Sequence, residues 1–116
     1  MKVLKFGGGC LKDAESIKKL PIILKQYDEN IIIVISAFGK LTNLLEQAYE
    51  TKNIDTVISF FVDIMKNLSF SEGIINEIRD DIKFSESIAD VLSVGELMSS
   101  KILSYYFQTQ NLPHTL

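Results

Sequence analysis

The stretch Met1-Lys-Val-Leu-Lys-Phe-Gly-Gly-Gly-Cys10 decides how this chain begins to fold. A short apolar run from Val3 to Phe6 breaks at the three glycines, and an amphipathic segment follows from about Asp13. This order predicts a strand, a glycine turn and a helix. Because glycine has no Cβ, such a turn reaches unusual backbone angles and lets a ligand approach the main chain. The free N–H groups at the start of a helix attract anions, so the segment is typical of a phosphate site.

A glycine run after a strand is a weak signal by itself. A tight turn without any ligand explains it equally well. The run lacks the Gly-Lys-Ser/Thr ending of a Walker loop, and it does not match the G-x-G-x-x-G dinucleotide pattern. Lys5, at the end of the predicted strand, would add a mobile positive charge to a phosphate site, but an edge-strand lysine in solvent is the simpler interpretation.

The composition narrows the possible classes of protein. The chain has 116 residues, of which 47% are apolar, which predicts one small globular domain rather than a disordered chain. The net charge of −3, without a basic cluster, argues against a nucleic-acid partner. The single cysteine excludes an internal disulfide and suits a reducing compartment. Since no apolar run has the length of a membrane span and no signal-peptide region is present, we expect a cytoplasmic protein without a membrane partner.

A second strand is predicted at Ile31–Ile35, after one helical segment. Apolar residues recur at helical spacing from Asp13 to about Tyr27, with Asp13 as the N-cap and a kink or restart at Pro21. Five β-branched residues in a row then predict a strand that is buried on both faces. Strand, helix and strand form a βαβ unit, which predicts a parallel sheet with a right-handed crossover.

The second strand ends in another turn of small residues, Ser36-Ala-Phe-Gly39. In open α/β sheets, ligands bind beyond the carboxyl ends of the strands. Both turns lie at that edge of the predicted sheet. Two such turns make a binding site there more probable than either turn does alone.

The rest of the chain is predicted to be helical. A capping box, Ser69-x-x-Glu72, precedes the third of four helices, which are expected over residues 41–51, 57–68, 74–82 and 88–111. Two hydrophobic strands alone would leave aggregation-prone edges. We therefore expect a third strand to follow the last helix, with the chain forming the front part of a larger domain or being completed by a partner.

Four polar residues are candidates for chemistry, and each has a simpler structural explanation. Besides Lys5, Ser36 is explained as the end of a strand, Thr42 as a helix cap and Glu96 as an exposed helix carboxylate. Gly95, just before Glu96, is less ordinary, because glycine inside a helix costs about 1 kcal/mol relative to alanine. Its presence predicts that another element packs closely against the backbone there.

Together these residues resemble a known family. Lys5-Phe-Gly-Gly8, Ser36-Ala-Phe-Gly39-x-x-Thr42 and Ser93-Val-Gly95-Glu96-Leu97 resemble, in the same order, the N-terminal half of the catalytic domain of aspartate kinases, which belong to the amino-acid kinase family. The resemblance implies an α/β protein with the three-layer α/β/α fold of that family. Residues 1–116 would form an incomplete N-terminal part of the catalytic domain.

The resemblance also implies a reaction and a set of site residues. The reaction is ATP-dependent phosphorylation of the β-carboxylate of L-aspartate to 4-phospho-L-aspartate, the first step of lysine, threonine and methionine biosynthesis. It implies ATP and Mg²⁺, although no ligand cluster for the metal is evident, and a homo-oligomeric full-length protein. By this resemblance Lys5 is the catalytic residue and steadies the phosphates, Gly7, Gly8 and Gly9 cradle them, Ser36 and Gly39 line the nucleotide side, and Thr42 and Glu96 hold the aspartate, Glu96 by pairing with its ammonium group or with Lys5.

The chain departs from the family pattern at Gly9-Cys10, where relatives usually carry Thr-Ser. Both hydroxyl donors near the phosphates are lost, and a thiol is a poor donor that becomes a thiolate more readily at a helix N-terminus. Weaker phosphate binding is expected. The alternative function is therefore a non-catalytic, kinase-derived module that binds a ligand or a partner. Within the enzyme interpretation, we expect the chain to be inactive alone, and a fusion to homoserine dehydrogenase stays open.

Overall fold

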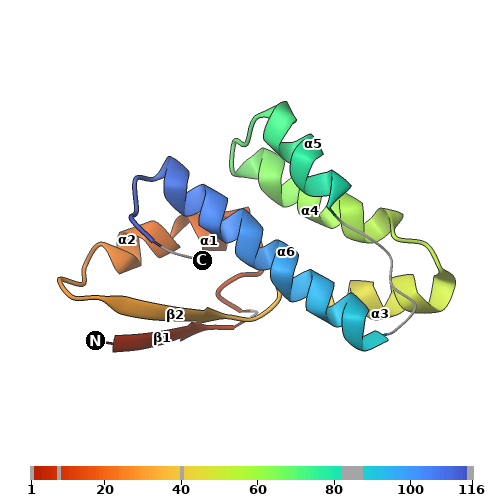
Figure 1. Cartoon of the computed structure of the whole chain (residues 1–116), viewed down its shortest axis with the longest axis horizontal. Helices are drawn as coiled ribbons and strands as arrows, with labels where there is room; N and C mark the ends of the chain where they lie inside the picture. The colour runs from red at the N-terminus through yellow and green to blue at the C-terminus, as the bar shows by residue number, and fades with distance from the viewer. Residues whose placement is uncertain (1, 8, 40, 82–87, 115–116) are drawn as a thin grey trace.

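The computed structural model of the chain describes residues 2–7, 9–39, 41–81 and 88–114, with the backbone alone for residues 88–92. Two strands and six helices lie within these ranges, and helices dominate (Figure 1). In chain order they are β1 (Lys2–Phe6), α1 (Ala14–Lys18), α2 (Leu20–Leu24), β2 (Ile31–Ile35), α3 (Leu41–Thr51), α4 (Asp55–Asn67), α5 (Glu72–Asp80) and α6 (Ile88–Thr109).

The βαβ start predicted from the sequence is confirmed. β1 and β2 pair in parallel, in a register that runs from Lys2 opposite Ile31 to Phe6 opposite Ile35. The helical connection is split in two, with α1 ending at Lys18 and α2 starting at Leu20. The expected restart follows from Pro21, which has no N–H to donate to the carbonyl one turn earlier.

The two-stranded sheet has one buried face and one exposed face. α1, α2 and α6 lie above the strands in the view of Figure 1, and the alternate residues Phe6, Ile33 and Ile35 are turned toward the core. On the opposite face, Ile32 and Val34 are 49% and 45% exposed. The expectation that β2 is buried on both faces is therefore wrong for the described residues. A β-branched run specifies a strand but not what covers it.

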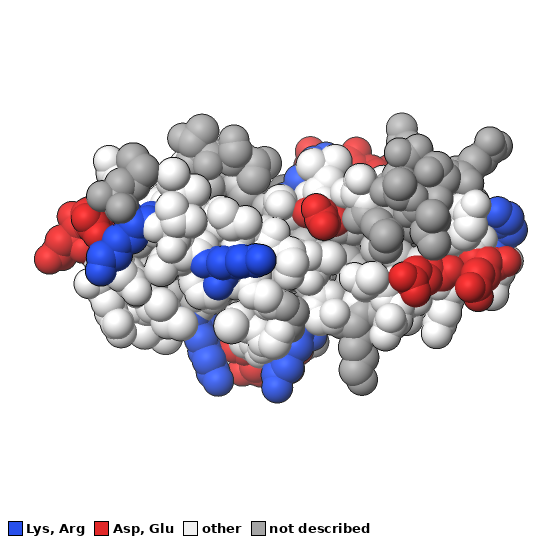
Figure 2. Space-filling model, turned by 90° about the horizontal axis from the view of Figure 1, so that it is seen from below, with Lys and Arg blue, Asp and Glu red and all other residues white. Residues whose placement is uncertain are grey.

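The exposed face is shown in Figure 2, which views the molecule from below. It is a largely uncharged surface with scattered basic side chains, and acidic side chains gather mainly toward the two ends. Among the described residues, no helix is both long enough and apolar enough to cross a membrane.

The helices α3 to α6 pack around a second part of the core. Fully buried side chains join them there, including Phe38, Phe61 and Ile102. α6 approaches α3 closely at Gly95, where an added Cβ would collide with Leu45 Cδ1 and lie 3.3 Å from Leu41 Cδ2. The predicted close packing against the backbone of Gly95 is thus confirmed.

The expected capping box in front of α5 is wrong. Ser71, not Ser69, is the N-cap, and its hydroxyl accepts the N–H of Ile74 at 3.4 Å. Ser69 instead ends α4, with a left-handed φ of 65°. Its N–H donates to the carbonyl of Lys66, and the next N–H, from Phe70, donates to that of Met65, which is the Schellman arrangement for a helix end.

Candidate functional site

The second of the two turns at the carboxyl ends of the strands packs against the residues that directly follow the first turn, Leu11 and Lys12. Gly39 has a φ of 24°, and a Cβ there would lie 2.8 Å from Lys12 Cα and 3.0 Å from the Lys12 carbonyl oxygen. The N–H of Gly39 donates to the carbonyl of Leu11 at 3.2 Å. Backbone meets backbone at this point, so only glycine fits. The second turn is thereby fixed against the segment that follows the first.

The first turn leaves open space beside the main chain, but its described glycines do not adopt the unusual backbone angles that were expected. Gly7 and Gly9 are exposed, and an added Cβ at either would meet no atom within 4 Å. Neither has a positive φ, since Gly39 is the single described glycine that does. The N–H of Cys10 closes the turn by donating to Gly7 O at 3.0 Å. The chain itself therefore does not require glycine at these positions, and they leave free space beside the main chain. Gly8 lies outside the described residues.

The helix after the first turn contributes less to anion binding than expected. α1 has five residues, and the predicted N-cap Asp13 is confirmed, because its Oδ1 accepts the N–H of Ser16 at 2.8 Å. This hydrogen bond, more than the nearby lysines, holds the pKa of Asp13 below its usual value. The start of α1 is thus already occupied by a carboxylate of the chain. A phosphate would have to be held by turn amides and lysine side chains instead.

Lys5 is positioned by β1. It pairs in register with Val34 and shares the exposed face of the sheet with Val3, one residue before the buried Phe6. No ion pair joins Lys5 to Glu96 in the part of the chain that the structure describes. The ammonium group therefore lies in solvent at the edge that carries both turns, which agrees with the simpler interpretation and leaves the group available to a ligand.

Ser36 and Thr42 flank the second turn. The half-buried Ser36 extends the strand pairing, because its N–H donates to Phe6 O at 3.3 Å. Thr42 is exposed in the first turn of α3, which begins at Leu41, so Thr42 is not the cap of that helix. The simpler explanation of Thr42, as the cap of this helix, is therefore wrong.

Glu96 reaches the same region through α6. Its side chain is exposed, and the preceding Gly95 packs on Leu41 at the start of α3. The close approach of the two helices thus brings the segment with Glu96 beside the segment with Thr42. The structure therefore places Gly39 against the Leu11–Lys12 backbone that follows the first turn, and it places Thr42 and Glu96 on two helices that meet at Gly95.

One residue at this edge was missed by the sequence analysis. Ser99 of α6 is fully buried, and its hydroxyl accepts the N–H of Phe38 at 3.2 Å and donates to Gly95 O at 2.8 Å. The signal was a small polar residue within the apolar stripe of a helix. That pattern shows that a partner is needed but does not say which segment provides it.

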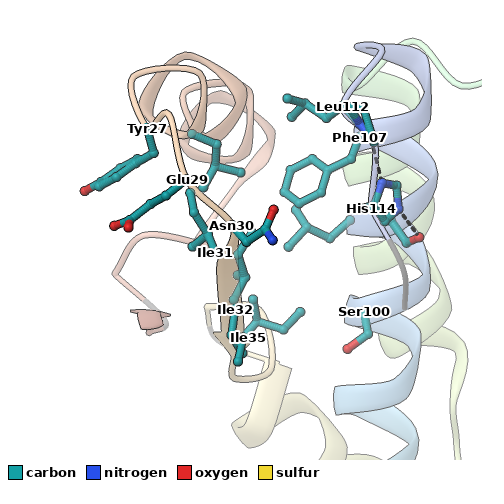
Figure 3. Close-up of a pocket in the computed structure, with 15 residues that line it drawn as sticks. Tyr27, Glu29, Asn30, Ile31, Ile32, Ile35, Ser100, Phe107, Leu112 and His114 are labelled. Atoms are coloured by element: carbon teal, nitrogen blue, oxygen red, sulfur yellow. Dashed lines mark hydrogen bonds between the residues drawn. The ribbon is translucent and has the colours of Figure 1, made fainter. Parts of the chain in front are cut away.

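A separate groove lies elsewhere on the described part of the chain. It has a volume of about 740 Å³ and runs between β2 and the C-terminal half of α6 (Figure 3). Ile31, Leu103 and Phe107 line it. At its rim, His114 Nε2 and Ser104 Oγ form a hydrogen bond of 2.6 Å. None of the predicted site residues lines this groove. Its mainly apolar walls do not suit a phosphate or an amino-acid carboxylate.

No metal site is formed by the described residues, where no three His, Cys, Asp or Glu side chains gather in a way that could hold an ion. The chemistry available at the edge of the sheet is therefore that of turn amides, an exposed lysine, hydroxyl groups and one carboxylate. Such groups bind and orient charged ligands.

Comparison with known proteins gives a consistent result. The model of the amino acid kinase family matches residues 1–115. The chain is 27% identical over 129 residues to aspartokinase 2, chloroplastic, of Arabidopsis thaliana, and this match covers 90% of the chain and 24% of the relative. It is 28% identical over 139 residues to bifunctional aspartokinase/homoserine dehydrogenase 1, chloroplastic, of Zea mays, covering 96% of the chain and 15% of the relative. The chain thus spans about a quarter or less of these relatives.

Solved structures share the fold. Aspartokinase III of E. coli in complex with aspartate and ADP superposes with a TM-score of 0.75 at 20% identity, over 96% of this chain and 29% of that one. The aspartate kinase of Clostridium acetobutylicum gives a TM-score of 0.68 at 24% identity, over 91% of this chain and 29% of that one. The fold class expected from the sequence is confirmed.

Proposed function

The chain belongs to the amino acid kinase family, and on that premise we propose that it forms the N-terminal part of the catalytic domain of an aspartate kinase. The reaction is transfer of the γ-phosphoryl group of ATP to the β-carboxylate of L-aspartate, the first step of lysine, threonine and methionine biosynthesis. The observation that carries the proposal is the contact of Gly39 with the Lys12 backbone, which joins the second turn to the segment that follows the first turn at one edge of the sheet. The name shared by the relatives supports the choice of aspartate.

Each predicted residue has a role in this proposal. Lys5 is the catalytic residue, whose ammonium neutralises charge on the transferred group, while the amides of Gly7, Gly8 and Gly9 cradle the phosphates. Ser36 and Gly39 line the nucleotide side. Thr42 and Glu96 hold the amino acid, the carboxylate of Glu96 by accepting hydrogen bonds from the substrate ammonium.

Transfer needs few reacting groups from the protein. A β-carboxylate oxygen of aspartate attacks the γ-phosphorus, the bond from that phosphorus to the bridging oxygen breaks, and ADP leaves with the electron pair. No proton has to be removed from the ionised carboxylate, so a general base is not required. The protein accelerates the step by alignment and by charge stabilisation, which the turn amides and Lys5 supply.

We assign no residue of this chain to Mg²⁺. The described residues form no cluster of ligands for it. Homo-oligomer formation by the full-length protein belongs to the same proposal. The chain is also proposed to be inactive by itself, since it spans 24% of the Arabidopsis relative.

A second candidate function is a non-catalytic module derived from such a kinase. Cys10 favours it, because this exposed thiol stands in the first turn where a hydroxyl donor is expected. Such a module would keep the joined turns and bind a ligand without transferring phosphate.

A titration of the ¹⁵N-labelled chain with L-aspartate tests the proposed function. We expect saturable shifts of the amide signals of Thr42 and of Glu96 and its neighbours, and none with D-aspartate. Thr42→Val and Glu96→Gln, both at exposed positions, are expected to weaken binding without loss of stability. Shifts that are absent, or that D-aspartate reproduces, would contradict the proposal.

A companion assay distinguishes enzyme from fragment or module. The chain is incubated with Mg-ATP, L-aspartate and hydroxylamine, which traps aspartyl phosphate as a hydroxamate. We expect no product from the chain alone. Product that disappears in Lys5→Ala would mean that the site is complete within 116 residues, and the proposed inactivity of the chain would be wrong.

A further inference from the structure

Ser99 is the one small polar residue that is buried in the core among the residues whose side chains the structure describes. It lies on α6, one turn after Gly95, and its exposed surface is 0%. Buried hydroxyl groups are tolerated when both donor and acceptor capacities are used. Ser99 meets this condition with partners from two separate parts of the chain.

The two hydrogen bonds of Ser99 reach both sides of the proposed site. Its Oγ donates to Gly95 O at 2.8 Å, the common bond of a helical serine to the carbonyl one turn earlier. The same oxygen accepts the N–H of Phe38 at 3.2 Å, across 61 residues of sequence. Phe38 belongs to the second turn and directly precedes Gly39. Gly95 directly precedes Glu96. The Ser99 hydroxyl therefore links the backbone next to Gly39, on the proposed nucleotide side, to the backbone next to Glu96, on the proposed aspartate side.

Helix geometry does not explain the second bond. A helical serine satisfies its donor within its own helix and needs nothing from a distant turn. Phe38 is itself fully buried, so its N–H would lose its recorded partner, away from water, if the hydroxyl were removed. Gly39 is meanwhile fixed on its other side by the Lys12 backbone. The second turn is thus held between the Leu11–Lys12 segment and α6.

We propose that Ser99 is a positioning residue, which fixes the Ser36–Gly39 turn relative to Glu96 so that nucleotide and aspartate are presented to each other in a constant geometry. This inference rests on the proposed function and adds a residue that touches neither ligand. Its hydroxyl acts only through the amide of Phe38 and the carbonyl of Gly95.

The test compares Ser99→Ala with Ser100→Ala, the neighbouring and half-buried serine of the same helix. The first readout is hydrogen exchange of the Phe38 amide, normalised to amides in α4 to remove changes in global stability. We expect exchange to be about tenfold faster in Ser99→Ala and unchanged in Ser100→Ala, because loss of one buried hydrogen bond corresponds to about that factor.

The second readout is the L-aspartate dissociation constant from the amide shifts of Thr42. It is expected to rise about fivefold to tenfold in Ser99→Ala, while Ser99→Thr, which keeps the hydroxyl, recovers at least part of the affinity. Equal exchange in the Ala variants would overturn the inference. So would faster exchange with unchanged aspartate affinity, since Ser99 would then be structural only. A wild-type chain that does not respond to aspartate contradicts the proposed function instead, and the positioning role fails with it.

Discussion

The glycines of the first turn differ from Gly39 and Gly95 in what surrounds them. At Gly39 and Gly95 an added Cβ would strike other atoms of the chain. At Gly7 and Gly9 it would meet nothing within 4 Å. Glycine is therefore required by internal packing in one region, and in the other it leaves space that the chain does not use. At Gly7 and Gly9, which follow the carboxyl end of β1, this open space leaves room for a ligand to approach the main chain.

The largest expected effect is that of Gly39→Ala. A Cβ would press on the backbone of Lys12, which cannot rotate away, and the φ of 24° is unfavourable for alanine. We expect a loss of about 2–4 kcal/mol in the free energy of unfolding. Urea denaturation measures it, with Gly9→Ala as the matched control, for which a change below about 0.5 kcal/mol is expected. Similar losses in both variants would remove the distinction between crowded and open glycines.

A smaller effect is expected for Gly95→Ala, because the obstacle is the end of the flexible Leu45 side chain. Overpacking of about 2 kcal/mol is offset by about 1 kcal/mol of helix propensity, so a net loss of about 1 kcal/mol is expected. In a Leu45→Ala background the obstacle is gone, and the same substitution should become neutral or stabilising. A double-mutant cycle measured by thermal or urea unfolding tests this. An equal penalty in both backgrounds would show that the helix contact is not the reason for glycine.

The smallest effect concerns pH at the border of the first turn. The N–H of Ser16 lowers the pKa of Asp13 in the folded chain, so Asp13 stabilises the fold above its unfolded pKa. That contribution is lost as the pH falls through the lowered folded pKa. Asp13→Asn, which can still cap but does not titrate, should reduce the acid dependence of unfolding between about pH 5 and 2. The same acid slope in both proteins would contradict this assignment.

Local chemistry made much of the framework predictable. The glycine break after Phe6, the restart at Pro21 and the cap at Asp13 all depend on neighbours within a few residues, and the structure has each of them. The meeting of the two turns at one edge followed from the rule that parallel strands end on the same side.

Features that depend on residues far away in the sequence, or on two helices competing for the same residue, were not predictable. The sequence favoured Ser69 as the cap of α5, because Glu72 follows three residues later, but the end of α4 takes Ser69 into a left-handed conformation and Ser71 caps α5 instead. The hydrogen bond from Phe38 to Ser99 spans 61 residues, and no local pattern specifies it. The exposed face at Ile32 likewise depends on which elements cover the sheet rather than on the strand itself.

The joined turns are the central claim, and a titration of the ¹⁵N-labelled chain with ADP tests it most directly. We expect saturable amide shifts in both turns, at Gly7, Gly9 and Gly39, with Lys5→Ala weakening the affinity. The apolar groove of Figure 3, beside Ile31 and Phe107, should remain unaffected. Shifts confined to that groove, or found in neither turn, would contradict a phosphate site at this edge of the sheet.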